Sequence, residues 1–367
     1  GWNGIEFIGT PATNDSSKIE YCLFEYGKTN LDDDAGALYI WNFEKVKLGH
    51  CAFKNNIGYF GGAVKCFYNA GILIQNCLFD NNYSISSAGG LFIGYSNIDL
   101  INNLFINNSS DYFGGAIHIR DEASYFNEYN IINNTICDNS SNKGGGIYHL
   151  HTPDCFYYNN IIYGNTANYG SQIYKSGYNL EFYYCDIEGG QAGIYPSFSG
   201  VYENCIETNP QFDGTGDHPY NLTAISPCIN AGTPDTTGLN LPATDFAGNP
   251  RIYDGIVDRI DIGAYEFQGE PGPLGIPQNV DIEVIGTDVH ISWDEVTGAN
   301  SYKIYASDDP YSADWGTAVD TVFAPNTTWT SSITEEKKFY YVVASTETAR
   351  RKLNIKKKVT GKLIRRK

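Results

Sequence analysis

The residues best suited to chemistry follow a recurring glycine-rich tetrapeptide. Each stands one or three positions after the apolar residue that closes a tetrapeptide, so the period of two along a strand places all of them on one face of one sheet. Aromatic rings stack on sugar rings, and cations can meet the carboxylates of an acidic polymer. We therefore predict an exposed face that binds an extracellular polysaccharide or another cell-surface component. Its aromatic members are Tyr39, Trp41, Phe67, Phe92, Tyr148 and Tyr174, and its cationic or titratable members are Lys65, His118 and Arg120.

Other interpretations of this face stay open. Its rings could simply pack as cross-strand pairs on a solvated sheet. Lys65, His118 and Arg120 are weak candidates for the catalytic groups of a polysaccharide lyase, because Arg keeps its proton unless it is strongly perturbed. A hydrolase would need two carboxylates flanking the bond, and neighbouring repeats of one outward column hold no such pair. A structural spacer or adhesin without a small ligand is the second alternative. Binding without catalysis is the expectation.

A repeat with a period of about 26 residues builds this face. Each copy has an apolar residue, Cys or Asn three positions later, Phe or Ile two positions after that, and then Asn. The period is typical of a solenoid, and Gly and Asn suit its corners because they tolerate positive φ. Residues 1–207 are therefore predicted to form an all-β, right-handed parallel β-helix of about eight turns. The Cys or Asn anchors are Cys22, Cys51, Cys77, Asn103, Asn134, Asn160 and Cys185.

The anchor column predicts a polar and sulfur-containing interior. Buried thiols behave as small apolar groups, and stacked Asn side chains can hydrogen-bond along the axis. The nine cysteines show no C-x-x-C spacing, so a structural role is preferred to metal or redox chemistry. A disulfide between Cys205 and Cys228 is left undecided.

A second column consists of the residues that directly follow the anchors. They are mostly apolar where an outward side chain is expected, so either the strand bends and they belong to the core, or another element packs on them. The core interpretation is preferred. These residues are Leu23, Ala52, Leu78, Leu104, Thr135 and Ile161.

Residues 208–268 change character and carry two specific blocks, Ser226-Pro-Cys-Ile-Asn-Ala-Gly232 and Asp261-Ile-Gly-Ala-Tyr-Glu266. With the coil, they resemble bacterial surface proteins in which right-handed β-helix repeats, similar in fold to pectate lyases, precede a choice-of-anchor Q domain. The resemblance implies a secreted or surface-anchored protein and supplies no catalytic residues. Because an open solenoid end exposes unpaired strands, we expect this module to cap the coil. Arg251 is expected to form a structural ion pair with Asp261 or Glu266.

The remaining chain predicts a linker, a second domain and a tail. Residues 269–276 are rich in Pro and Gly. Residues 277–346 resemble a fibronectin type III sandwich with Trp293 in the core and Tyr340 as a tyrosine corner, although the final strand is missing after Thr346. The tail at 347–367 is either a basic arm for nucleic acid or anionic lipid, or the product of out-of-frame translation. The second interpretation is preferred, and the chain is expected to be a fragment.

The charge and composition of the chain limit the classes of partner that it is expected to bind. The net charge is −18, and since residues 350–367 hold ten of the 24 basic residues, the rest carries 14 basic against 42 acidic residues, or −28. Such a surface does not favour nucleic acid or an anionic membrane. No apolar run is long enough for a transmembrane segment. Asp32-Asp-Asp34 could bind calcium but is more typical of a solvated corner, and no other cofactor or metal is expected. We expect a monomer that is extracellular or on a bacterial cell surface.

Overall fold

The computed structural model describes residues 2–10, 16–29, 35–69, 71–122, 127–152, 155–177, 180–251, 259–269, 276–296, 299–308, 316–332 and 338–345. They divide into two units, of which the larger extends to Gly275 and the smaller begins at Ile276. The regular secondary structure of both units is almost entirely β-strand, and the one described helix is the short 3-10 helix η1, Gly190–Gly193.

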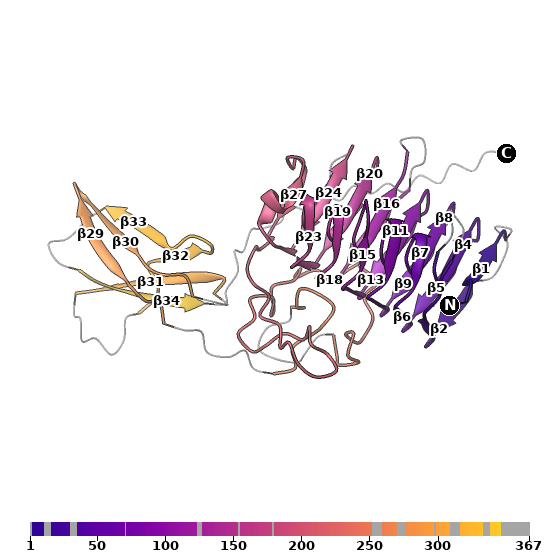
Figure 1. Cartoon of the computed structure of the whole chain (residues 1–367). Helices are drawn as coiled ribbons and strands as arrows, with labels where there is room; N and C mark the ends of the chain where they lie inside the picture. The colour runs from indigo at the N-terminus through magenta and orange to yellow at the C-terminus, as the bar shows by residue number, and fades with distance from the viewer. Residues whose placement is uncertain are drawn as a thin grey trace, which may run out of the picture. The chain divides into compact units, whose positions relative to one another are not determined.

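The larger unit is a parallel β-solenoid with four sheets (Figure 1). Its first sheet contains β1 (Ile5–Ile8), β4 (Leu38–Trp41), β8 (Val64–Phe67), β12 (Leu91–Gly94), β16 (Ile117–Arg120), β20 (Ile147–Leu150), β24 (Ile173–Ser176) and β27 (Ile194–Tyr195). The second contains β3 (Leu23–Glu25), β6 (Ala52–Lys54), β10 (Leu78–Asp80), β14 (Leu104–Ile106), β18 (Thr135–Cys137), β22 (Ile161–Tyr163) and β26 (Asp186–Ile187).

The other two sheets complete each turn. The third contains β7 (Ile57–Phe60), β11 (Tyr83–Ser87), β15 (Ser109–Ser110), β19 (Ser140–Lys143) and β23 (Thr166–Tyr169). The fourth contains β2 (Ser17–Glu20), β5 (Val46–Gly49), β9 (Ile72–Gln75), β13 (Ile98–Ile101), β17 (Tyr129–Ile132), β21 (Cys155–Tyr158), β25 (Leu180–Tyr183) and β28 (Val201–Glu203). Among the described residues, two sheets hold eight strands and the third only five, so the outermost of the roughly eight predicted turns are incomplete.

Glycine and the phenylalanine stack explain how the turns approach one another. The rings of Phe24, Phe53, Phe79 and Phe105 stack in successive turns with centroids 4.4–4.9 Å apart. At the opposite corner, a Cβ on Gly115 would lie 2.0 Å from the carbonyl oxygen of Gly145. A side chain there would push the turns apart, which is why the tetrapeptide needs glycine.

Two asparagine ladders run through the interior and confirm the predicted stacking. In the longer one, Asn56, Asn82, Asn108, Asn139 and Asn165 each pass a hydrogen bond to the next, from Nδ2 to Oδ1, over 2.9–3.0 Å. The shorter ladder links Asn103, Asn134 and Asn160 over 3.0 Å. In each bond between two amides the acceptor lies toward the C-terminal end of the coil, while the same Nδ2 also donates to a backbone carbonyl of the preceding turn. The ladders satisfy polar groups that would otherwise be costly to bury.

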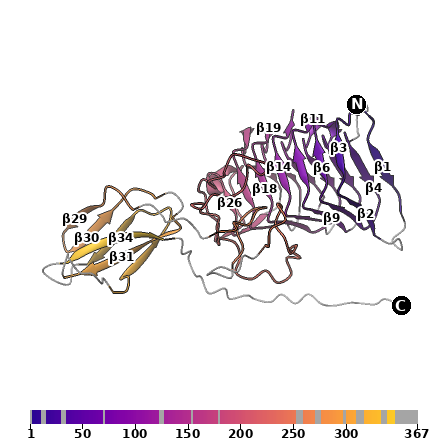
Figure 2. The same ribbon diagram turned by 90° about the horizontal axis from the view of Figure 1, so that it is seen from below.

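The core interpretation of the residues after the anchors is wrong. Leu104, Thr135 and Ile161 are buried because residues 208–268, here called the loop module, pack over them with Leu222, Ile229, Ile262 and Ala264. Leu23, in a turn where no such packing occurs, is 61% exposed. The loop module is drawn beside the coil in both Figure 1 and Figure 2.

The loop module also does not act as the expected end cap. Its described contacts run along the second sheet, where Asn133 donates to Gly263 O, Thr135 accepts from the Ala264 amide, and Tyr220 donates to Asp138. The last turn of the coil is instead covered by Phe198 and Tyr202, whose rings lie 5.6 and 6.1 Å from that of Phe182.

The smaller unit has two three-stranded antiparallel sheets. One contains β29 (Asp281–Ile285), β30 (Asp288–Ser292) and β33 (Thr328–Ser332), and the other β32 (Asp320–Phe323), β31 (Ser301–Ser307) and β34 (Phe339–Ser345). Trp293 is buried against Tyr302, with ring centroids 5.2 Å apart, while Tyr340 contacts Trp329. The segment after Thr346, where the final strand of the sandwich is predicted to be missing, and the basic tail both lie outside the described residues. Within the described ranges, no helix has the length and apolarity that crossing a membrane requires.

Candidate functional site

The structure places all nine predicted site residues on the outer face of the first sheet. One in-register row holds Tyr39, Lys65, Phe92, His118, Tyr148 and Tyr174, and the row two positions on holds Trp41, Phe67, Gly94 and Arg120. Their exposure differs sharply. Trp41 is 38% exposed, whereas Lys65 and His118 are only 3% and 4% exposed. The predicted open stripe is therefore partly covered.

Aromatic residues from the preceding corner provide part of this cover. The ring of Phe60 at the end of β7 lies 5.2 Å from that of Phe92, and Phe113 lies 4.8 Å from Tyr148. Phe60 and Phe113 both directly precede a Gly-Gly pair, and this position is the signal in the sequence that identifies them. The period of two identifies a face of a sheet but not the side chains that fold over it.

One end of the outer face forms a pocket of about 460 Å³. Gly94 helps to shape it, since a Cβ there would lie 2.3 Å from Phe67 Cδ2, and the Phe67 ring occupies that space. Six predicted residues therefore converge, together with Phe60, which was missed. The pocket is lined by Tyr39, Trp41, Phe60, Lys65, Phe67, Phe92 and Arg120, and we call it the aromatic pocket.

The two cations of the pocket are held by aromatic rings. Lys65 Nζ lies 4.6 Å from the centroid of Tyr39, 5.6 Å from Phe60 and 5.5 Å from Phe67. Such cation–π contacts stabilise an ammonium group that has lost most of its water. Arg120 is exposed, with its guanidinium carbon 5.7 Å from the Tyr95 ring. One cation is thus held in a buried position, and the other lies against Tyr95 at the exposed edge of the pocket.

His118 lies outside the aromatic pocket. Its ring stands among those of Phe92, Phe113 and Tyr148, at 4.9, 6.1 and 4.8 Å. Neither ring nitrogen has a hydrogen-bond partner among the described residues, and burial lowers the pKa of His118 to about 3. The three lyase candidates therefore do not line one cavity.

Tyr148 and Tyr174 extend the aromatic face away from the pocket. Their rings stack 5.0 Å apart, and Tyr174 lies 5.3 Å from Tyr195, which is 42% exposed. Lys143 Nζ lies 5.4 Å from the Tyr174 ring. The same combination of rings and a cation thus recurs further along the sheet.

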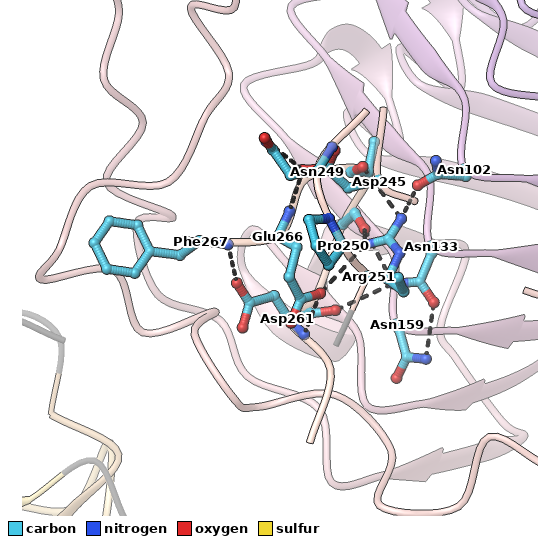
Figure 3. A network of polar contacts seen from close by, with 12 residues as sticks. Asn102, Asn133, Asn159, Asp245, Asn249, Pro250, Arg251, Asp261, Glu266 and Phe267 are labelled. Atoms are coloured by element: carbon cyan, nitrogen blue, oxygen red, sulfur yellow. Dashed lines mark hydrogen bonds and ion pairs between the residues drawn. The ribbon is translucent and has the colours of Figure 1, made fainter. Parts of the chain in front are cut away.

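A separate polar site joins the loop module to the coil (Figure 3). Arg251 is buried, donates to the Gly263 and Ala264 carbonyls and to Asn102 Oδ1, and has Nη1 3.6 Å from Glu266 Oε2. The predicted pairing of Arg251 is thereby confirmed by its contact with Glu266. Burial outweighs the favourable field of Arg251 and raises the pKa of Glu266 to about 9 and that of Asp261 to about 7. These contacts are those of a structural joint.

A metal centre does not emerge from the described part of the chain, where no group of three or more His, Cys, Asp or Glu residues could hold an ion. Asp32-Asp-Asp34, the predicted calcium candidate, lies outside the described residues.

Comparison with known families gives one local similarity. The model of the Chlamydia polymorphic membrane protein repeat matches residues 104–120. This stretch includes Phe105 of the ring stack, Asn108 of the longer ladder and the Gly114-Gly115 corner, so it contains the features that let one turn stack on the next. A search of curated proteins finds no match. The repeat and the parallel coil together fit a surface β-helix protein.

Proposed function

We propose that this chain belongs to a cell-surface protein that binds an extracellular polysaccharide along the outer face of its first sheet. The aromatic pocket carries this proposal, since it combines an exposed indole, several further rings, a buried ammonium group and an exposed guanidinium group. Sugar-binding sites need flat apolar surfaces beside a few fixed polar groups, and the pocket offers both.

The two cations favour an acidic polymer in this proposal. Arg120 at the exposed edge can grip a carboxylate with two parallel hydrogen bonds, while Lys65 adds positive potential from below. Trp41 offers its ring face to the adjoining sugar. The rings of Tyr148, Tyr174 and Tyr195 then extend the contact along the chain of the polymer.

The alternatives make different demands on the same face. A lyase requires a base beside the proton that it removes, and His118 is separated from the pocket by Phe92. A spacer requires no pocket. The assignments of the loop module to a choice-of-anchor Q domain and of the smaller unit to a fibronectin type III domain are also proposals. The first is supported by the role of Asp261 and Glu266 at the coil joint, and the second by the burial of Trp293 between strands.

Binding of the full chain to an array of neutral and acidic polysaccharides tests the function. We expect an acidic polymer to bind, and Trp41→Ala to raise Kd about tenfold or more, which corresponds to about 1.4 kcal/mol. Arg120→Ala should remove the preference for acidic over neutral polymers. Tyr21→Ala is the matched control, since Tyr21 is 77% exposed and lies at a different corner of the coil.

The other outcomes identify the alternatives. Absence of binding to every polymer would overturn the proposal and leave the spacer. Release of an unsaturated product, followed by its ultraviolet absorbance and lost in His118→Ala, would establish the lyase instead.

A further inference from the structure

The interior column that contains the shorter asparagine ladder ends in cysteines on both sides. Register places Cys22, Cys51 and Cys77 in successive turns before Asn103, because Leu23, Ala52 and Leu78 are paired. Beyond Asn160, the bridge between Asp186 and Ile206 places Cys185 next to Cys205. Each end of the column therefore holds a pair of neighbouring cysteines, Cys22 and Cys51 at one end and Cys185 and Cys205 at the other.

These thiols occupy the positions that the amides occupy in the middle of the column. Cys51 Sγ lies within hydrogen-bond distance of the carbonyls of Ile19 and Gly49, at 3.4 and 3.3 Å, and its one proton can go to either. Asn160 Nδ2 contacts the equivalent two carbonyls, which are Ile131 O in the preceding turn and Tyr158 O two positions earlier in its own turn. The sulfurs therefore point along the axis toward the neighbouring turn, as the amides do.

The spacing of the two pairs suits a disulfide. Neighbouring strands of a parallel sheet lie about 4.8 Å apart, inside the range of roughly 4.4–6.8 Å that bridged Cα atoms show and slightly above the roughly 3.5–4.5 Å of bridged Cβ atoms, so closure draws the two residues together by a few tenths of an ångström. The backbone amide of Cys185 donates to Cys205 Sγ at 3.4 Å, which puts the sulfur of one residue directly over the other.

Access to solvent distinguishes these cysteines from the rest. Cys22 is exposed and Cys205 is half-buried, whereas Cys51 and Cys185 beside them are buried, as are all the other cysteines. Each end of the column thus offers one thiol that an oxidant can reach and one buried thiol next to it. Exposed cell-surface proteins meet an oxidising environment in which such pairs close.

We propose that Cys22–Cys51 and Cys185–Cys205 are oxidation sites that close as disulfides between turns. The oxidant is a small disulfide such as oxidised glutathione. The thiolate of the accessible cysteine attacks it, releases one glutathione thiol and forms a mixed disulfide; the buried neighbour then loses its proton and displaces the second glutathione thiol. Two protein thiols are oxidised, and one glutathione disulfide is reduced to two thiols.

The state of Cys51 favours the second step at the N-terminal end. A hydrogen bond from Cys77 lowers the pKa of Cys51 to about 7, so a useful fraction is thiolate near neutral pH. The undecided Cys205–Cys228 pairing is disfavoured, because the Cys228 thiol instead donates to Asp186 Oδ2 at 3.3 Å. The two bonds would hold the terminal turns, where a solenoid otherwise frays.

Peptide mapping of the full chain tests the proposal. The reduced protein is incubated with oxidised glutathione, its remaining thiols are blocked with N-ethylmaleimide, and it is digested with trypsin and Glu-C without reduction. We expect peptide 21–25 linked to 48–54 and peptide 182–188 linked to 204–207. The free-thiol count should fall from nine to five, since nine minus two pairs leaves five.

Each single variant serves as a control for the other. Cys22→Ser should remove only the first link and Cys205→Ser only the second, and the oxidised protein should show a higher Tm than the reduced one. A link from 204–207 to the Cys228 peptide, a link from 48–54 to the Cys77 peptide, or glutathione that stays on Cys22 or Cys205 would overturn the assignment. An unchanged Tm after both links form would overturn the role as end clamps.

Discussion

The interior asparagine ladders and the Arg251 joint bury polar groups in opposite ways. In the ladder, neutral amides satisfy one another, as Asn108 shows by accepting from Asn82 and donating to Asn139. At the joint, Arg251 is surrounded by the acids Asp245, Asp261 and Glu266, and burial raises the pKa of two of them. A neutral network can be repeated in every turn, whereas a buried ionic cluster occurs once and depends on pH.

Breaking the ladder in its middle should have the largest effect. Asn108→Ala removes the partner of the Asn82 amide and backbone N–H and leaves Asn139 Oδ1 without its side-chain donor. Because unsatisfied buried groups cost about 1 to 3 kcal/mol each, we expect a loss of about 3 to 5 kcal/mol in the free energy of unfolding, measured by urea denaturation. Asn168→Ala, in an exposed asparagine pair, is the control and should cost less than about 0.5 kcal/mol. Equal losses would contradict the ladder's role.

The joint should give the protein a pH-dependent stability that the ladder lacks. The folded-state pKa of Glu266 is raised to about 9 from an ordinary value of 4.5, so the folded protein holds a proton that the unfolded chain releases. The contribution of protonated Glu266 to the free energy of unfolding is complete below a pH of about 4.5 and is lost as the pH rises through about 9. Glu266→Gln should reduce this decline by up to about 1.4 kcal/mol per pH unit in denaturation series at several pH values. Glu20→Gln, which removes one carboxylate at a surface ion pair, is the matched control.

Two buried histidines allow a comparison between a polar side chain that has hydrogen-bond partners and one that has none among the described residues. His149 bonds to Thr152 and Tyr157, whereas His118 has no partner among the described residues. His149→Phe should therefore cost about 1 to 3 kcal/mol, and His118→Phe should be neutral or stabilising by up to about 1 kcal/mol.

A pH series provides a second readout for His118. Its folded pKa is lowered to about 3, so its contribution is complete above about 6.5 and is lost as pH falls toward 3. The advantage of His118→Phe should accordingly grow between pH 6 and 4. A constant difference across that interval would mean that His118 is not buried as a neutral ring.

The sequence predicted whatever repeats from turn to turn. The register of Leu38, Val64 and Leu91 and the stacking of Asn103, Asn134 and Asn160 follow from a constant spacing, since each copy reports the same local geometry. Repetition supplies seven or more observations of one rule.

What the sequence did not predict depends on contacts between distant segments. Leu104 and Ile161 are buried by residues more than fifty positions away, in a module with no repeat to indicate where it packs. The burial of Lys65 and His118 has a local cause instead, since the rings of Phe60 and Phe113, five positions earlier in the chain, fold over the outer face. Each ring precedes a Gly-Gly pair, but that position in the sequence does not say which face the ring covers.

The shared direction of the interior amides has an electrical consequence. Strand dipoles run around the coil and not along its axis, but the side-chain dipoles of one ladder add head to tail, so the coil has an axial polarity comparable in kind to that of a helix. Its positive pole lies at the C-terminal end, because each Oδ1 accepts from the amide of the preceding turn. The ladder continues from Asn165 through Gln172 to the carboxylate of Glu188, with 2.8 and 2.5 Å between donor and acceptor. A negative charge therefore stands where the column of dipoles stabilises it most.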